Sequence, residues 1–125
     1  MTWLAVAIGG AMGSMARHWV NLEIAHRLER SVPWATFVVN VVGCVVMGIL
    51  AGRVAGGRWH MTTTMRTFLF VGVLGGFTTF SSFGLDTFTL GHGGEHEAAV
   101  WNVIGQVSLG VGGVWLGYYL GLAAR

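Results

Sequence analysis

The sequence predicts an all-α integral membrane protein with four transmembrane helices, and three observations lead to this fold class. Hydrophobic residues make up 54% of the 125 residues, charged residues make up only 10%, and the mean hydropathy is +0.66. A soluble domain usually has about 25% charged residues, so this surface suits lipid and not water. Polar stretches also divide the chain into four apolar runs, each close to the roughly 20 residues that span a bilayer.

The four apolar runs give the predicted helices in chain order. They are Thr2 to about Val20, Pro33 to about Gly52, Arg66 to about Leu90, and Ala98 to Ala124. Polar stretches close them at residues 21–31, 53–64 and 91–97. Pro33 suits a helix start, where its missing N–H has no helical acceptor to lose. Residues 1–125 are therefore predicted to form a single four-helix transmembrane domain with both termini on the same side.

Small residues recur at four-residue spacing in three of these runs. The chain has 21 Gly, and the spaced ones are Gly9 with Gly13, Gly48 with Gly52, and Gly113 with Gly117 and Gly121. In a bilayer such residues let two helices approach closely. The pattern predicts tight helix packing and carries no further functional meaning by itself.

The basic residues favour neither orientation in the membrane. All seven are Arg, and the side that holds both termini carries Arg53, Arg58, Arg66 and Arg125, against Arg17, Arg27 and Arg30 on the other. Orientation normally follows a clear excess of Lys and Arg on the cytoplasmic side. Four against three is no excess, so the sequence permits insertion both ways and an antiparallel homodimer. The Arg residues form no basic face, so no nucleic-acid partner is expected despite a pI of 9.3.

The third run contains an unusual stretch near its middle, Gly75-Gly76-Phe77-Thr78-Thr79. Two adjacent Gly cost about 1 kcal/mol each inside a helix, and the β-branched Thr pair adds to that cost. Thr78 or Thr79 could cap a new helical start. We therefore predict a broken third helix. The carbonyl oxygens freed by such a break must be buried in protein or bind ions, and they suit a hard cation such as Na+.

Three side chains at membrane depth are candidates for an ion pathway. Asn40 lies seven residues after Pro33, about 10 Å along a helix, and could line a pathway or simply hydrogen-bond another helix. Phe80 and Phe83 are three residues apart and share a helix face. Such a pair commonly packs in lipid or in a core, but its ring edges can also solvate a small anion.

The sequence contains no motif that indicates catalysis. There is no nucleophile–base arrangement, phosphate loop or Cys/His zinc spacing, and Cys44 stands alone. His92 and His96 have helical spacing, yet the Gly residues around them favour a solvated loop over a metal site. We expect a protein that moves a small ion and is not an enzyme.

Three motifs resemble, in order, those of the CrcB/Fluc fluoride channels. Residues 9–17 read GGAMGSMAR, similar to the family's pattern GGxxG(A/S)xxR, and residues 33–40 read PWATFVVN, similar to PxGTLxxN with Ala35 in place of Gly. Residues 75–83 read GGFTTFSSF, close to the family's GGxTTFSTF. The last motif is long and unusual in composition, and with the four-helix length the resemblance covers nearly the whole chain.

The resemblance implies a dual-topology homodimer with two antiparallel fluoride pathways and a structural Na+ at the dimer centre. Main-chain oxygens of Gly75 and Thr78 would hold the Na+, and Arg17 would lie in a vestibule. The implied pathway residues are Asn40, Phe80, Phe83, Thr79, Ser81, Ser82 and Ser108. Ile104 and Gly112 depart from the family's fourth helix and leave its polar lining open.

The implied function is passive fluoride export across the cell membrane, a bacterial inner membrane, which protects the cell from fluoride that enters as HF. Two alternatives are a small multidrug-type transporter and a structural membrane subunit. The transporter would need an acidic residue in the first apolar run, and none is present. The structural subunit would explain the Gly packing but not the stretch Thr78 to Phe83.

Overall fold

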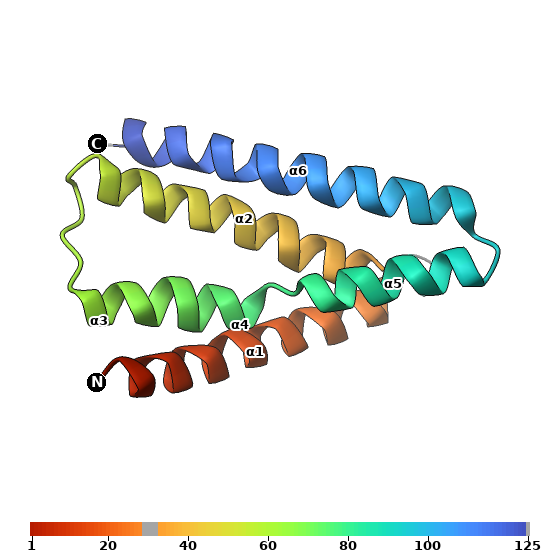
Figure 1. The fold of residues 1–125 in the computed structure, drawn as a ribbon, viewed down its shortest axis with the longest axis horizontal. Helices are drawn as coiled ribbons and strands as arrows, with labels where there is room; N and C mark the ends of the chain where they lie inside the picture. Colours follow the sequence, from red (N-terminus) through yellow and green to blue (C-terminus); the bar gives the residue numbers. More distant parts are fainter. Residues whose placement is uncertain (29–32, 125) are drawn as a thin grey trace.

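The computed structural model describes residues 1–28 and 33–124. Its elements are α1 (Thr2–Arg27), α2 (Trp34–Ala55), α3 (Thr63–Arg66), the π-helix η1 (Thr67–Leu74), α4 (Gly75–Phe77), α5 (Phe80–His92) and α6 (His96–Ala123). The elements α3, η1, α4 and α5 follow one another along a single rod, so the described residues form four helical rods, and both ends of the chain lie at the same end of the bundle (Figure 1). The all-α class is confirmed, and the described ranges contain no strand.

Three of the four rods are long and apolar enough to cross a membrane. They are Trp34–Ala55, Thr63–His92 and His96–Ala123. α1 has 26 residues but is not among them, because Arg17, His18 and Asn21 reduce its apolar character. A membrane span in α1 stays a prediction.

α1 continues beyond its predicted end at Val20. The helix includes Asn21 and runs to Arg27, whose guanidinium donates to the Glu23 carboxylate at 3.3 Å one turn back. Polar residues end an apolar run, but helical hydrogen bonds form equally well in turns that face water. The predicted polar closing stretch is therefore partly helix. Arg30 and Arg125, which enter the predicted arginine balance, lie outside the described residues.

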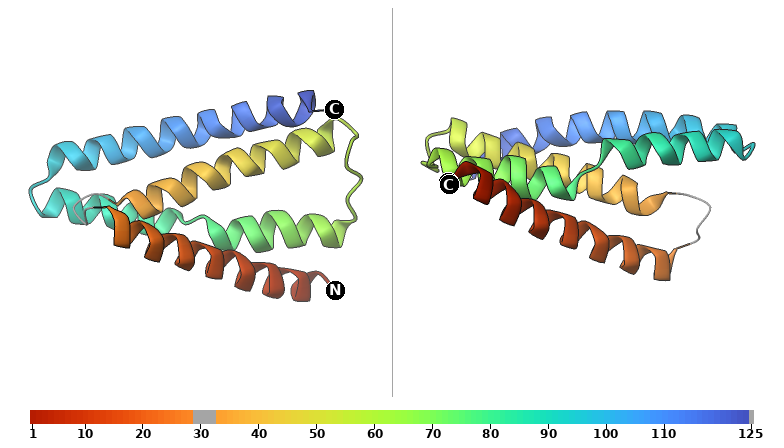
Figure 2. Two further views of the ribbon diagram at one scale, coloured as in Figure 1. Left: turned by 180° about the vertical axis from the view of Figure 1, so that it is seen from behind. Right: turned by 60° about the horizontal axis from the view of Figure 1, so that its bottom comes forward.

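The predicted glycine contacts are confirmed. α2 packs along α6, and α1 packs along η1 and α4 (Figure 2). A Cβ added at Gly48 would overlap the Val114 carbonyl of α6, and one at Gly117 would overlap the Val45 carbonyl of α2. Backbone atoms of a neighbouring helix also lie against Gly9, Gly13, Gly52 and Gly121, and the Val45 side chain lies against Gly113. Because glycine has no side chain, the helix backbones can approach one another closely at these positions.

The third rod changes its hydrogen-bond pattern before it is interrupted. The Gly75 N–H donates to the Phe70 carbonyl five residues back, and the Thr78 N–H donates to the Leu74 carbonyl four residues back at 3.0 Å. Thr78 (φ −82°, ψ 159°) and Thr79 (φ −153°, ψ 113°) then have extended backbone. Figure 1 shows this non-helical step between α4 and α5.

Candidate functional site

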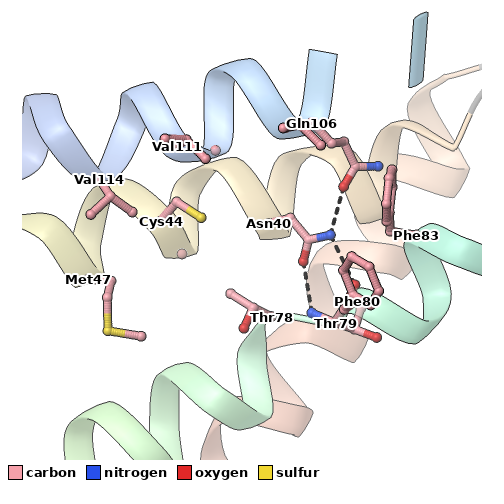
Figure 3. A pocket seen from close by; sticks show the side chains of 13 residues that line it. Asn40, Cys44, Met47, Thr78, Thr79, Phe80, Phe83, Gln106, Val111 and Val114 are labelled. Atoms are coloured by element: carbon pink, nitrogen blue, oxygen red, sulfur yellow. Dashed lines mark hydrogen bonds between the residues drawn. The ribbon is translucent and has the colours of Figure 1, made fainter. Parts of the chain in front are cut away.

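Asn40 of α2 is held against the non-helical step at Thr79. Its Oδ1 accepts from the Thr79 N–H at 2.8 Å, and its Nδ2 donates to the Thr79 carbonyl at 3.0 Å. The peptide N–H can only donate and the carbonyl can only accept, so this pairing fixes which side-chain atom is which. The second hydrogen of Nδ2 is directed to Gln106 Oε1 at 2.7 Å (Figure 3). An anion at Asn40 would have to replace one of these acceptors.

Two buried side-chain amides of α6 extend this contact, and neither was predicted from the sequence. Gln106 Nε2 donates to Asn102 Oδ1 at 3.0 Å, and Asn102 Nδ2 donates to Thr87 Oγ1 of α5 at 2.9 Å. Their residue exposures are only 7% and 6%. The available signal was an Asn and a Gln four residues apart in an apolar run, on the stripe that continues to Gly110 and Gly113.

A cavity of about 420 Å³ opens beside the non-helical step, between α2, α5 and α6. Phe80 and Phe83 lie on one side of it, with ring centroids 5.4 Å apart and planes tilted by 49°. Its polar lining residues include Asn40, Thr78, Thr79 and Gln106 (Figure 3). Phe80 is 82% exposed, so the chain itself leaves this ring largely uncovered. Ring edges carry partial positive charge, so the aromatic cavity offers a small anion weak contacts beside amide groups.

A second, polar cavity of about 250 Å³ shares Thr79 with the aromatic cavity. Its lining residues are Ser14, Arg17, His18, Asn21, Thr36, Thr79 and Ser82. Arg17 is half-buried there, and none of the lining residues is acidic. The polar cavity therefore attracts anions.

Hydroxyl groups gather at the start of α5, where both cavities meet. Thr79 Oγ1 accepts from the Ser82 N–H at 3.2 Å and so caps the helix. The same oxygen lies 3.0 Å from Ser82 Oγ and 3.3 Å from Ser81 Oγ. Hydroxyls can rotate to donate or accept. This cluster can therefore donate hydrogen bonds to an anion that passes Thr79.

The two main-chain oxygens expected to hold Na+ lack their helical donors. The Gly75 carbonyl would accept from the Thr79 N–H in an unbroken helix, but that N–H donates to Asn40. The Thr78 carbonyl would accept from the Ser82 N–H, which donates to Thr79 Oγ1. Freed carbonyl oxygens are the donor type that suits Na+. The chemistry of these two oxygens therefore fits the ion.

Ser108 lies away from both cavities. It is exposed on α6, and so are Ile104 and Gly112 on either side of it. The α6 residues that line the aromatic cavity are Gln106, Val107, Gly110, Val111 and Val114. A role for Ser108 in the pathway stays a prediction, and it requires something beyond this chain to face the exposed stripe.

His92 and His96 do not share a helix. α5 ends at His92 and α6 begins at His96, so the connection between the helices is residues 93–95 and is shorter than the predicted loop at 91–97. The His92 ring stacks on Phe88, with centroids 5.5 Å apart. In the part of the chain that the structure describes, no three His, Cys, Asp or Glu side chains gather as a metal site.

Comparisons with known proteins find related sequences over most of the chain. Residues 4–118 match the family described as "CrcB-like protein, Camphor Resistance (CrcB)". A protein of Paramagnetospirillum magneticum named fluoride-specific ion channel FluC is 43% identical over 119 residues, which cover 94% of this chain and 93% of the relative. Proteins of the same name from Nitrobacter winogradskyi and Paracoccus denitrificans are 46% and 47% identical, covering 94% and 96% of this chain and 94% of each relative.

Matches of this extent exceed what a shared helical architecture alone would produce, because they run through all four rods and through the three motifs. The family is one of ion channels and not of enzymes. With several apolar helices of spanning length, the chain is a multi-pass membrane protein. The resemblance carried by the three motifs is confirmed, and this chain belongs to the CrcB-like family of channel proteins.

Proposed function

We propose that this protein is a fluoride-specific channel that lets fluoride leave the cell passively. The observation that carries the proposal is the pair Phe80 and Phe83 in the aromatic cavity with the amides of Asn40 and Gln106. The name that the relatives share, fluoride-specific ion channel FluC, supports the same ion. A site made of ring edges and hydrogen-bond donors holds an anion weakly, and a channel needs weak binding because a tightly held ion does not leave.

Each predicted pathway residue has a place in this proposal. Fluoride would collect in the polar cavity under the positive charge of Arg17. It would pass the hydroxyls of Thr79, Ser81 and Ser82, which substitute for lost water. It would then reach the aromatic cavity of Phe80, Phe83 and Asn40. Ser108 would serve from its exposed stripe only if a second copy lies against that stripe.

The active form in this proposal is an antiparallel homodimer with dual topology. Among the described residues, the end that holds the termini carries Arg53, Arg58 and Arg66, and the other end carries Arg17 and Arg27. This difference is small, so both orientations remain accessible. In an antiparallel pair, the exposed Phe80 and the exposed stripe around Ser108 would gain a protein neighbour.

A structural Na+ completes the proposed dimer centre. The exposed Gly75 and the half-buried Thr78 of one chain supply two main-chain oxygens, and hard cations take about six oxygen ligands. Two copies would supply four such oxygens. When bound, the ion would neutralise the partial negative charges of the freed carbonyls. If the dimer assembles and conducts equally well after preparation without any Na+, this part of the proposal is wrong.

The physiological role would be resistance to fluoride in a bacterial inner membrane. Fluoride enters cells as neutral HF and is trapped as the anion at a higher internal pH. A passive pathway is sufficient for exit because the membrane potential drives anions outward. The expected phenotype of a deletion strain is growth inhibition by fluoride that the wild-type gene relieves.

Fluoride efflux from liposomes that contain only this protein tests the channel directly. A fluoride electrode should record rapid release from loaded vesicles when a potassium ionophore supplies the balancing charge. Vesicles loaded with chloride and followed with a chloride electrode should release almost nothing. Release of both anions at similar rates, or release of neither, would contradict the proposal.

A further inference from the structure

A continuous line of hydrogen bonds connects the non-helical step to a residue two turns further along α5. We call it the amide relay and define it by Asn40, Gln106, Asn102 and Thr87. In order, the donors are Asn40 Nδ2, Gln106 Nε2, Asn102 Nδ2 and the Thr87 hydroxyl, which donates to the Phe83 carbonyl at 2.8 Å. Each side chain accepts from one neighbour and donates to the next.

The direction of the amide relay is set at its first bond. The Thr79 N–H requires an acceptor, so Asn40 presents Oδ1 to it and Nδ2 to Gln106. Gln106 must then present Oε1 to Asn40 and Nε2 to Asn102, which passes the same order to Thr87. A reversal at any member would place two donors or two acceptors face to face. Because Gln106 and Asn102 are buried, water cannot repair such a mismatch.

The amide relay begins and ends at residues of the α5 segment. Thr79 is the N-cap of α5, and Thr87 lies within the same helix. The line leaves α5 at Thr79, crosses to α2 at Asn40, continues to α6 at Gln106 and Asn102, and returns to α5. Three rods are therefore tied at the level of the non-helical step by side chains, whereas α2 and α6 meet elsewhere through glycine.

From this arrangement we infer that Gln106, Asn102 and Thr87 are positioning residues for the non-helical step. Because the Thr87 hydroxyl donates to the Phe83 carbonyl, it must accept from Asn102, and this end of the relay therefore imposes on Asn40 the same orientation that the Thr79 N–H requires. The bond from the Thr79 N–H to Asn40 in turn keeps the Gly75 carbonyl free of its helical donor. The inference concerns the backbone at residues 75–79, and it rests on the proposed fluoride channel only where ion flux is the readout.

A matched pair of substitutions on α5 separates this role from ordinary packing. Thr87→Val and Thr89→Val each remove a hydroxyl that makes the same kind of hydrogen bond. Each hydroxyl donates to the carbonyl four residues back, at 2.8 Å and 2.9 Å respectively. Only Thr87 also accepts from Asn102. Thr87 lines neither the aromatic cavity nor the polar cavity. The amide relay is the hydrogen-bonded route by which Thr87→Val would reach the Thr79 backbone.

The direct readout is hydrogen–deuterium exchange at the Thr79 amide in the reconstituted protein. Thr87→Val leaves the Asn102 donor without an acceptor in a buried place, and we expect Thr79 exchange to rise by at least about threefold. Thr89→Val should leave it within experimental error of the wild type. Fluoride efflux should fall in Thr87→Val and not in Thr89→Val. Equal Thr79 exchange in the two variants would overturn the inference.

A second experiment tests whether the three residues act as a unit. It also provides a further variant in case Thr87→Val folds poorly. Gln106→Met keeps the side-chain length but can neither accept nor donate the two relay bonds. If Gln106, Asn102 and Thr87 act together, the double variant Thr87→Val/Gln106→Met should expose the Thr79 amide little more than the stronger single variant. Strictly multiplied effects would mean independent contacts and would also overturn the inference. Absence of efflux from the wild type with these exchange results intact would instead refute the channel.

Discussion

The aromatic and polar cavities lie next to one another at Thr79 and differ in almost every other respect. The aromatic cavity is larger, about 420 Å³, and is walled mainly by rings and aliphatic groups. The polar cavity is about 250 Å³ and is lined by hydroxyls, an amide, a histidine and Arg17. The difference indicates that the attraction of anions and their passage depend on different cavities. The charge of Arg17 attracts anions to the polar cavity, and uncharged ring edges and amides contact them in the aromatic cavity. The two cavities should therefore respond differently to substitution and to salt.

The largest expected effect lies in the aromatic cavity. Phe80→Ile or Phe83→Ile keeps bulk and hydrophobicity but removes the ring quadrupole. We expect fluoride efflux to fall to the level of protein-free liposomes while the protein still assembles and purifies normally. Phe77→Ile is the control, because Phe77 lies in the same motif but outside both cavities. Near wild-type efflux in the variants at 80 and 83 would show that the rings only fill space.

A smaller loss is expected where α2 meets the non-helical step. A Cβ added at Gly43 would overlap the Thr78 side-chain methyl, and Thr is stiff at χ1. Overpacking of this kind costs about 1–3 kcal/mol, so Gly43→Ala should lower efflux roughly tenfold by moving the step. Gly91→Ala is the control on α5, since an added Cβ there meets no atom of this chain within 4 Å. Normal efflux in Gly43→Ala would mean that the step tolerates movement.

Thr78→Val should be milder still. The Thr78 hydroxyl donates to the Leu74 carbonyl at 3.0 Å, and Val removes this bond while it keeps the methyl that faces Gly43. One such bond contributes about 1 kcal/mol, so efflux should stay within roughly threefold of the wild type, with a small drop in melting temperature. The proposed ion ligand is the main-chain oxygen, which Val retains. Complete loss of efflux in an assembled variant would assign the hydroxyl as a ligand instead.

The fold was largely predictable because apolar runs and spaced glycines are read directly from sequence. Gly48 and Gly117 were expected at helix contacts and lie there, since only bare backbone permits such an approach. The end of α1 was not predictable from polarity, because a helix that leaves the membrane can continue in water. Arg27 and Glu23 support that continuation.

The candidate site was predictable only where a motif or a helix-breaking pattern marks it. Thr78 and Thr79 stand out because β-branched residues follow two glycines. The sequence alone did not identify Gln106 and Asn102, because the role of an amide in an apolar run depends on its hydrogen-bond partner on another helix. Asn40 and Gln106 lie 66 residues apart in the chain, and no local pattern connects them.

The smallest expected effect belongs to Arg17 in the polar cavity, and it should depend on salt. Its charge attracts anions over a distance, and the screening length falls from about 30 Å at 0.01 M salt to about 10 Å at 0.1 M. Arg17→Gln should therefore lower efflux by less than about twofold at low salt and hardly at all at high salt. Arg27→Gln is the control, because Arg27 is 78% exposed, pairs with Glu23 and lies outside the polar cavity. It should change efflux less at every salt concentration. An equal loss in Arg17→Gln at both ionic strengths would mean that Arg17 supports the structure, and the separation between attraction and passage would then fail.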